Sequence, residues 1–308
     1  MKKLKSILCI TFAFILTAIV LCACGINNKE NQKVGTKTMI SLTEAKQLIV
    51  SALAINNNQL QTQSTNGMRV FAASANEGNR DIMEKLGRFS YNEYITETDI
   101  ETAQEVGNTY VIAEMLYESE IKKCLMENNW DTKPIIDYFD SDNHICYTYD
   151  DEKEDDEKIS SRTYSDEELN INRFAYVRAL FKDEAFDSIY DDTATKEINQ
   201  NGYSITLTGD LKGWIRYTYF LWGDYAVTDE EIDSMYNESI KDLPQETIDK
   251  CYFNLTVNID SNNDVVSAAV NVKYIQSGKF ICMSVTLTKT NAPIVEPDWV
   301  TEYKNSHN

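Results

Sequence analysis

The strictest constraint on the fold is a long alternation of apolar and polar residues near the end of the chain. Two turn-forming segments, residues 260–264 and 276–279, divide it into three parts. The alternating apolar positions are Phe253, Leu255, Val257, Ile259, Val266, Ala268, Val270, Val272, Ile281, Met283, Val285 and Leu287. A period of two indicates strands with one buried face, and short turns between such strands require antiparallel pairing. The sequence therefore predicts an antiparallel meander with one apolar face.

Other segments are also typical of strands. Residues 68–72, 89–96, 145–149 and 203–207 are short runs rich in aromatic or β-branched side chains. Residues 110–126 contain many helix formers, but Glu114 and Glu118 alternate with apolar residues. Because the alternation is regular, we predict a strand here, with a helix as the alternative.

Three sequences predict the starts of helices. Residues 41–44, 165–168 and 228–231 each have the Ser/Thr-x-x-Glu pattern of a capping box. The apolar stripes after them are Leu42, Ala45, Leu48, Ile49, Ala52 and Leu53; Ile171, Phe174, Val177, Phe181 and Ala185; and Ile232, Met235, Tyr236 and Ile240. Helices that are apolar on one side need a surface to cover, so we expect them to pack on the sheet as a single α+β domain over residues 41–308.

An aromatic run at residues 214–222 provides the candidate ligand-binding residues. Interpreted as a strand, it is apolar on both faces, with Trp214, Phe220 and Trp222 on one face. Ile215, Tyr217, Tyr219 and Leu221 then lie on the other. One set packs in the core, and the second either packs as well or lines a hydrophobic cavity. Trp214, Tyr217, Tyr219 and Trp222 are the residues that we predict to bind a ligand.

The N-terminus is typical of an export signal. Lysines at positions 2, 3 and 5 precede an apolar run over residues 7–20, followed by Leu-Cys-Ala-Cys at 21–24. This end resembles the lipobox of bacterial lipoproteins, in which the cysteine receives a diacylglyceryl group. The resemblance implies a signal peptide over residues 1–23, lipidation of Cys24 and a flexible tether over 24–40. The alternative is an uncleaved membrane anchor. We expect a Gram-positive-type bacterial protein on the extracytoplasmic face of the cell membrane.

The net charge limits the class of binding partner, and the cysteine content limits the possible disulfides. The formal net charge is −20, and it becomes −23 without the leader, which carries three lysines and no acidic residue. Nucleic acid is excluded as a partner because phosphate binding needs clustered cations. Cys124, Cys146, Cys251 and Cys282 remain in the mature body, as free buried thiols or as two disulfides, and we favour free thiols.

The chain lacks the common signatures of catalysis. No P-loop, dinucleotide fingerprint, zinc-protease or serine-hydrolase motif occurs, and His144 lies in a sequence typical of a surface turn. The acidic run at 150–158 is typical of a solvated hairpin tip. It and the 260–264 turn offer oxygen ligands for calcium, but neither matches an EF-hand loop. We therefore predict no catalytic residue, no metal and no cofactor. A hydrolase using carboxylates is the remaining catalytic alternative.

The order of these elements resembles the LolA/LppX-type lipoproteins, and within them an uncharacterised Gram-positive branch. The resemblance covers about residues 41–300 and is best at the terminal meander and the following segment, 292–297. It implies a curved antiparallel half-barrel whose helices close the concave side over an apolar cavity. The expected function is binding of a lipid or other hydrophobic ligand by a monomer. The alternative is an interaction or structural module of the cell envelope, of the same fold but with a filled core.

Overall fold

The computed structural model describes residues 34–54, 81–118, 121–129, 133–140, 142–155, 157–163, 177, 179–221 and 226–307. Several predictions fall outside these residues. They are the signal peptide and Cys24, the strand at 68–72, the helix start at 165–168, and Trp222.

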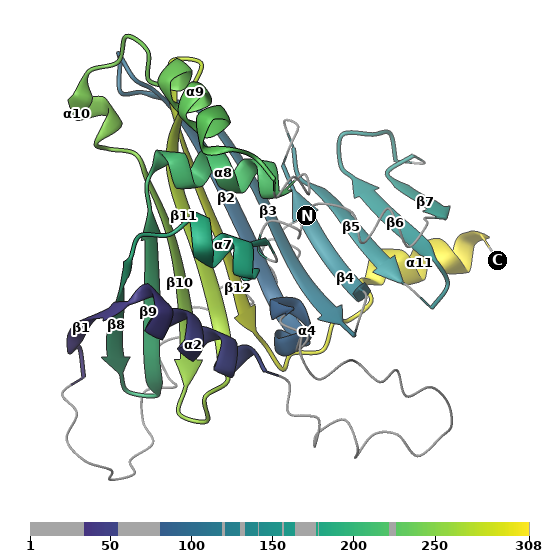
Figure 1. Cartoon of the computed structure of the whole chain (residues 1–308). Coiled ribbons are helices and arrows are strands. Elements are labelled where there is room, and N and C mark those ends of the chain that lie inside the picture. Colours follow the sequence, from purple (N-terminus) through teal and green to yellow (C-terminus); the bar gives the residue numbers. More distant parts are fainter. Residues whose placement is uncertain are drawn as a thin grey trace.

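The dominant element is one antiparallel sheet of twelve strands (Figure 1). In chain order these are β1 (Lys37–Ser41), β2 (Arg88–Asp99), β3 (Glu105–Tyr117), β4 (Ile121–Asn128), β5 (Ile135–Asp140), β6 (Ile145–Asp150), β7 (Ile159–Thr163), β8 (Thr193–Asn199), β9 (Gly202–Gly209), β10 (Tyr252–Asp260), β11 (Val265–Gln276) and β12 (Lys279–Lys289). Their spatial order is β1-β8-β9-β10-β11-β12-β2-β3-β4-β5-β6-β7. The sheet is open, and β1 and β7 are the edges of its described part.

Two successive meanders build this sheet. Strands β2 to β7 form the first and β8 to β12 the second, each with neighbours in sequence paired side by side. The last strand of the second meander, β12, pairs with the first strand of the first, β2, from Lys279 opposite Asp99 to Lys289 opposite Phe89. This single ladder makes the two meanders one sheet.

The predicted terminal meander is confirmed, with one correction to its register. Strands β10, β11 and β12 pair antiparallel in order. A shift in the β10–β11 pairing places Ile259 opposite Val265, whereas Asn258 lies opposite Ser267. Val266 is the extra residue of this bulge, so Val265 is buried where Val266 was predicted.

The ambiguous segment at 110–126 is extended, as we predicted, but it forms parts of two strands. Strand β3 ends at Tyr117 and β4 begins at Ile121. The two pair antiparallel, with Ala113 opposite Met126. The alternation of charge correctly indicated strands, and the helix-forming residues did not override it.

The described helices are α2 (Leu42–Leu53), α4 (Ile82–Leu86), α7 (Asp183–Ser188), α8 (Leu211–Leu221), α9 (Asp229–Ser239), α10 (Gln245–Ile248) and α11 (Asp298–His307). The predicted starts of α2 and α9 are confirmed. Ser41 Oγ accepts a hydrogen bond from the Glu44 N–H at 3.1 Å, and Thr228 and Glu231 cap each other reciprocally. On α9, Ile232 is buried as predicted, but Met235 is 42% exposed, so its inward orientation was wrong.

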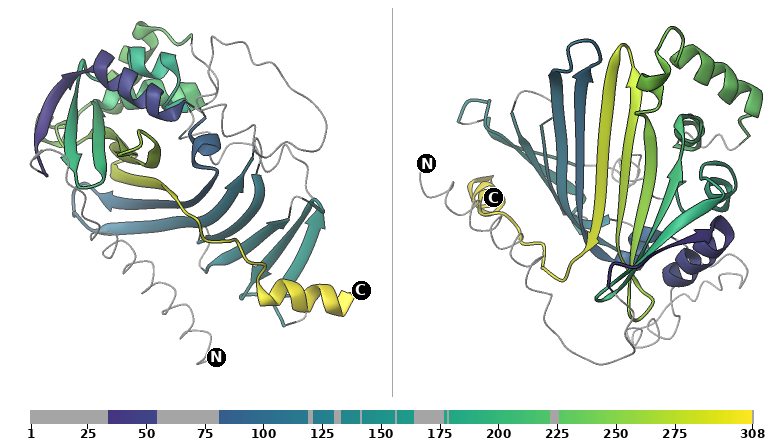
Figure 2. Two further views of the ribbon diagram at one scale, coloured as in Figure 1. Left: turned by 90° about the horizontal axis from the view of Figure 1, so that it is seen from below. Right: turned by 90° about the vertical axis from the view of Figure 1, so that its left-hand side faces the viewer.

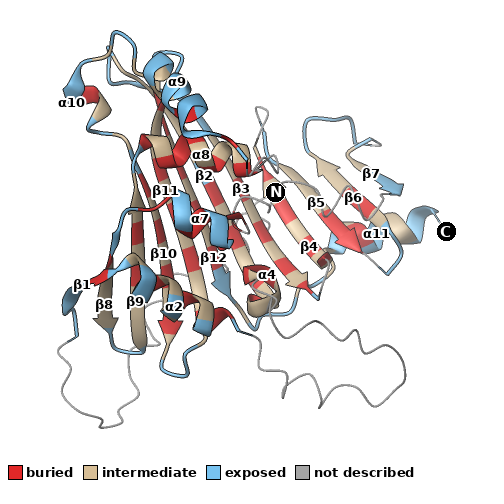
Figure 3. Cartoon of the chain, viewed as in Figure 1, coloured by how far each residue is buried: buried red, intermediate tan, exposed pale blue. Residues whose placement is uncertain are grey.

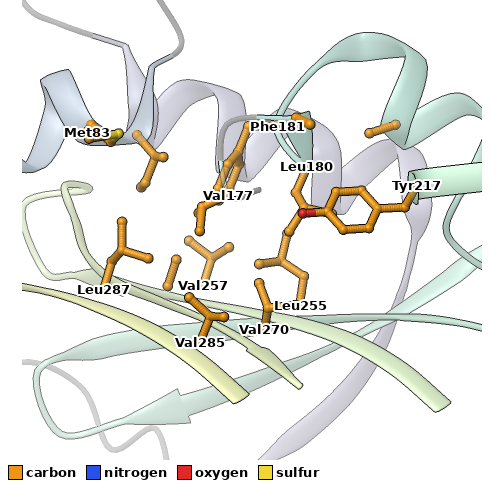
Figure 4. Close-up of a cluster of buried hydrophobic side chains, with 14 of the residues drawn as sticks. Met83, Val177, Leu180, Phe181, Tyr217, Leu255, Val257, Val270, Val285 and Leu287 are labelled. Atoms are coloured by element: carbon orange, nitrogen blue, oxygen red, sulfur yellow. The ribbon is translucent and has the colours of Figure 1, made fainter. Parts of the chain in front are cut away.

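Helices lie on both faces of the sheet, but most of those described lie on one face. Helices α2, α7 and α8 lie over one face, and α11 lies on the opposite face beside β5 and β6 (Figure 2). The inner face, as we call the side facing α2 and α8, carries stripes of buried residues along successive strands (Figure 3). In Figure 4, Val177, Leu180 and Phe181 point toward Val257 and Val285 of the sheet. The main core therefore lies between this face and the helices.

A smaller core lies on the outer face. Tyr138 and Tyr147, opposite each other on β5 and β6, pack with Val300 of α11. The sequence prediction missed this helix. Pro297 followed by Asp298 is a common helix start, and Trp299, Val300 and Tyr303 have helical spacing, so the signal was present.

Two further predictions for the body, the free cysteines and the acidic hairpin tip, agree with the structure. The four cysteines Cys124, Cys146, Cys251 and Cys282 are free, the first two of them buried. The acidic run joins the paired strands β6 and β7, and Lys158 forms ion pairs with Asp151 and Asp155 there. Among the helices that the structure describes, none is both long and apolar enough to cross a membrane.

One close approach of two backbones gives the first prediction. A Cβ atom on Gly213 of α8 would lie 2.3 Å from the Ile189 carbonyl oxygen, so α7 and α8 can meet only if this residue has no side chain. We expect Gly213→Ala to lower the free energy of unfolding by about 1–3 kcal/mol, as overpacking does, measured by urea denaturation. Gly107→Ala is the control, because its Cβ would meet only the Glu97 side chain at ordinary distances. Equal stability of the two variants would contradict the close contact.

Candidate functional site

The aromatic run that provides the predicted site is a helix and not the strand that we assumed. Helix α8 covers Leu211–Leu221. The Asp210 carboxylate begins it by accepting a hydrogen bond from the Gly213 N–H at 2.8 Å. Leu211, Trp214 and Ile215 are all buried, at the i, i+3 and i+4 spacing of one helix face. As a strand, the aromatic run would be apolar on both faces. As a helix, the same run is explained by one apolar face.

Two of the predicted ligand-binding residues lie in an aromatic cluster between α8 and the sheet. Trp214 is 7% exposed and Tyr217 is fully buried. Their rings lie 6.0 and 5.7 Å from that of Phe253 on β10, and Trp214 also lies 5.0 Å from Tyr274 on β11. Such separations are those of well-packed aromatic pairs. Trp214 and Tyr217 thus fill the space between helix and sheet.

Tyr219 lies away from this cluster. It is half-buried, and its hydroxyl lies 2.6 Å from the Met235 sulfur of α9. It therefore joins α8 to α9. The structure brings Trp214 and Tyr217 together but not Tyr219 with them, and Trp222 is outside the described residues.

A polar groove of about 430 Å³ lies where α7, α8 and α9 meet. Its two cations are both paired with carboxylates of α9. Lys212 lies 2.5 Å from Asp233, and Arg216 forms an ion pair with Asp229. The hydrogen bond that the Lys212 ammonium donates to the Asp233 carboxylate raises the pKa of Lys212. The groove is thus a salt-bridged junction of helices, with its positive charge already neutralised.

The inner face continues as an apolar surface onto β3 and β4. Buried residues there are Val111, Ala113, Met115, Tyr117, Ile121, Cys124 and Met126. Helix α2 contacts β1, β8, β9 and β11, α8 contacts β9 and β10, and the short helix α4 contacts β11, β2 and β3. The apolar face therefore extends over more strands than α2 and α8 contact.

Two polar side chains interrupt that surface in one cross-strand row. Glu93 of β2 lies opposite Val111 of β3, which lies opposite Asn128 of β4. Opposed residues of antiparallel strands project to the same face, so both side chains lie on the inner face. Glu93 and Asn128 are each only 6% exposed. Sequence reasoning did not find this pair, because Glu93 reads simply as one polar residue within a strand.

The two side chains differ in their hydrogen bonds. The Tyr91 hydroxyl donates to Glu93 Oε2 at 2.5 Å, from the same strand and the same face. The Asn128 side chain makes no hydrogen bond with another described residue, but its polar atoms are not fully buried, since Arg88 Nε is the one fully buried side-chain polar atom without a partner in the described part of the chain.

Burial also raises the pKa of groups on β5 and β6. Burial, with the nearby Asp140 carboxylate, raises the pKa of Tyr138 to about 12. Burial, with Asp137, raises the pKa of the Cys146 thiol to about 11, so this thiol stays protonated near neutral pH. His144 is exposed in a turn with φ of 53°, as predicted. Over the residues described, no three metal-ligating side chains form a group.

Comparison with known proteins does not identify a family. No protein-family description and no curated protein matches the chain. Solved structures give weak similarity to the ywiB protein from Bacillus subtilis, at 6% identity and a TM-score of 0.17, covering 67% of this chain and 94% of that one. A porin-like protein from Bacteroides uniformis gives 10% identity and a TM-score of 0.17, covering 65% and 96%. The Pseudomonas aeruginosa MucA/MucB complex gives 4% identity and a TM-score of 0.13, covering 66% and 89%. The LolA/LppX resemblance therefore stays a prediction.

The aromatic cluster gives the second prediction. We expect Trp214→Ala to lower the free energy of unfolding by about 3–5 kcal/mol, because it removes an indole packed against Phe253 and Tyr274. Tyr219→Phe, on the same helix, should change it by no more than about 0.5 kcal/mol. Urea denaturation measures both. A Trp214→Ala variant as stable as the wild type would show that the indole is not a packing residue.

Proposed function

We propose that this chain is a membrane-anchored extracytoplasmic lipoprotein without catalytic activity, which binds a lipid or another hydrophobic ligand. In this proposal Cys24 carries the diacylglyceryl anchor, and the monomeric body stands in the aqueous phase outside the membrane. The sheet acts as a half-barrel whose concave side is the inner face, with α2, α7 and α8 packed on it. The ligand lies on the same face, beside the helices.

The observation that supports this proposal is the width of the apolar inner face. Its buried row continues through Tyr91, Ala113 and Met126 on β2, β3 and β4. Helices α2 and α8 contact strands on the other side of the sheet's centre, and the short helix α4 contacts β2 and β3. An apolar chain bound along these rows would leave water, which contributes about 25 cal/mol per Å² of apolar area buried. Because Trp214 and Tyr217 pack against Phe253, we place the ligand along β2 to β4 and assign those two residues to the wall beside it.

A second function is favoured by a different observation. The aromatic cluster fills the space between α8 and the sheet, as expected for a domain with a filled core. Such a domain would act as an interaction module of the cell envelope, using its acidic surface. The net charge of −23 that remains without the leader would then select a cationic partner.

The anchor is tested by replacing the lipidated residue. We expect Cys24→Ala to abolish the incorporation of a radiolabelled fatty acid. It should also abolish the cleavage that produces the mature N-terminus. Both effects are expected because no acylated cysteine is formed. Cys22→Ala is the matched control and should leave labelling intact, because the lipobox places the modification at Cys24. Both chains are assayed in bacterial membrane fractions. Labelling that persists in Cys24→Ala would contradict this part of the proposal.

The proposed binding of a hydrophobic ligand is tested by placing a larger side chain in the proposed binding space. Residues 26–308 contain the whole described fold and are purified without Cys24 for native mass spectrometry and for titration with the apolar dye Nile red. Ala113 is 1% exposed in the row between Tyr91 and Met126. We expect Ala113→Phe to weaken Nile red binding about tenfold, because the ring occupies ligand space, and to lose about 1–3 kcal/mol of unfolding free energy, because Ala113 is buried.

Ala268→Phe is the matched control, at a fully buried alanine on β11, a strand that α2 and α4 contact. It should lose about 1–3 kcal/mol of stability by overpacking and keep its dye affinity when folded. If the wild type carries no lipid and takes up no dye, the ligand-binding function is wrong. Loss of stability in Ala113→Phe without an effect on the dye would instead support the filled core.

A further inference from the structure

We propose that the outer face of the central strands binds a neutral polysaccharide. The site is an uncharged surface of hydroxyl and amide side chains, flanked by two exposed tyrosines. It lies on the face of the sheet opposite to the proposed lipid site, and it does not depend on that site.

The surface consists of three neighbouring cross-strand rows over β9, β10, β11, β12 and β2. We call it the hydroxyl–amide patch, and its rows run through Asn254, Thr256 and Asn258 of β10. These three residues alternate with the buried core residues of β10, so they project to the outer face. Of the fifteen side chains in the patch, thirteen are serine, threonine or asparagine, and the other two are Ala269 and Tyr94.

The patch carries no charged side chain, although charged residues make up 25% of the chain. None of its fifteen residues is buried. Charged groups begin at its borders, with Lys273 in the next row and Glu114 on the next strand. An ionic partner would therefore find no complementary charge on this surface. A lipid or an apolar peptide would find little apolar area to cover.

Hydrogen bonds between strands hold several of these side chains in place. The hydroxyl oxygens of Thr206 and Thr256 lie 3.0 Å apart, and Asn258 Nδ2 donates to Ser267 Oγ at 2.8 Å. A hydroxyl has one donor and two acceptor sites, and an amide has two of each, so one such bond leaves most of this capacity unused. Sugar hydroxyls also both donate and accept, which makes a neutral sugar complementary to the patch.

The dimensions of the patch suit a polymer. Neighbouring strands lie about 4.8 Å apart, so five strands span about 19 Å. Alternate residues of a strand lie about 6.8 Å apart, so three rows span about 14 Å. An area of this size accommodates several sugar rings, whereas a single sugar would contact only a fraction of it.

Two exposed tyrosines flank the patch. Tyr94 lies at its β2 end and is 42% exposed, and Tyr252, one row beyond Asn254 on β10, is 43% exposed. The ring of Tyr94 lies 6.4 Å from that of Tyr110 on β3. The negative face of an aromatic ring attracts the C–H groups of a sugar ring. Three strand spacings, about 14 Å, separate the two exposed tyrosines, so one polysaccharide chain can contact both.

Depletion by insoluble polysaccharides tests this site. The full chain, in a mild detergent, is incubated with chitin and with cellulose, which present neutral sugars with and without an acetamide group. Chitosan, the cationic deacetylated form of chitin, is the comparison. We expect chitin or cellulose to deplete the wild type, with an affinity that changes less than about twofold between about 0.15 M and about 1 M NaCl, because salt screens only charges.

Variants assign the binding to the patch. Tyr94→Ala should weaken it about tenfold, because an exposed ring is lost. Thr286→Val combined with Thr288→Val should weaken it about fivefold and keep the thermal stability, because valine retains the shape of threonine and suits a strand. Met235→Ala is the control and should match the wild type, since this side chain is also 42% exposed but lies on α9.

The outcomes that overturn the proposal are distinct. One is that neither chitin nor cellulose depletes the wild type. Another is depletion by chitosan alone, or binding that is lost at high salt, because the net negative charge would explain either result. A third is wild-type affinity in both Tyr94→Ala and the double valine variant, which would place the polysaccharide elsewhere. The Nile red titration reports on the inner face, so the lipid function stands or falls separately.

Discussion

The ladder between β2 and β12 is the interaction on which the rest of the structure depends. Without it, the chain would contain two separate meanders of at most six strands, each with an additional open edge. The ladder has no register shift over its eleven paired positions, from Lys279 opposite Asp99 to Lys289 opposite Phe89. It aligns the buried residues of both meanders on the same face. The continuous inner face, and every proposal made for it, follows from that alignment.

Helix α8 shows how packing divides this face. It uses Trp214 and Tyr217 to cover Phe253 on β10, and its charged residues pair with α9 on the other side. One end of the sheet is thereby closed by aromatic rings. Toward β2, β3 and β4 the same face carries the buried aromatic residues Phe89, Tyr91 and Tyr117, aliphatic residues, methionines and the Glu93–Asn128 row. The two ends therefore differ in the helices beside them and in this polar row.

Local patterns predicted the elements that depend on local physics. The alternation in 253–287 gave three strands, and the capping boxes gave the starts of α2 and α9, because these signals involve neighbouring residues. The prediction failed at α8, where the strand interpretation overlooked Asp210 as a helix cap. It failed at Val266, since a bulge is set by pairing between strands. The Glu93–Asn128 row was not predictable either, because residues 35 positions apart meet only through the β2–β3–β4 register.

The order of the two meanders also affects how the chain folds. Strand β2 leaves the ribosome about 180 residues before its partner β12, and closing so long a loop has an entropic cost that local hairpins avoid. By relative contact order, the sheet should assemble slowly. Until β12 arrives, β2 presents unpaired backbone groups to any other extended chain, and such edges promote aggregation. A strand edge that stays unpaired during synthesis is thus a consequence of the strand order, irrespective of what the finished sheet binds.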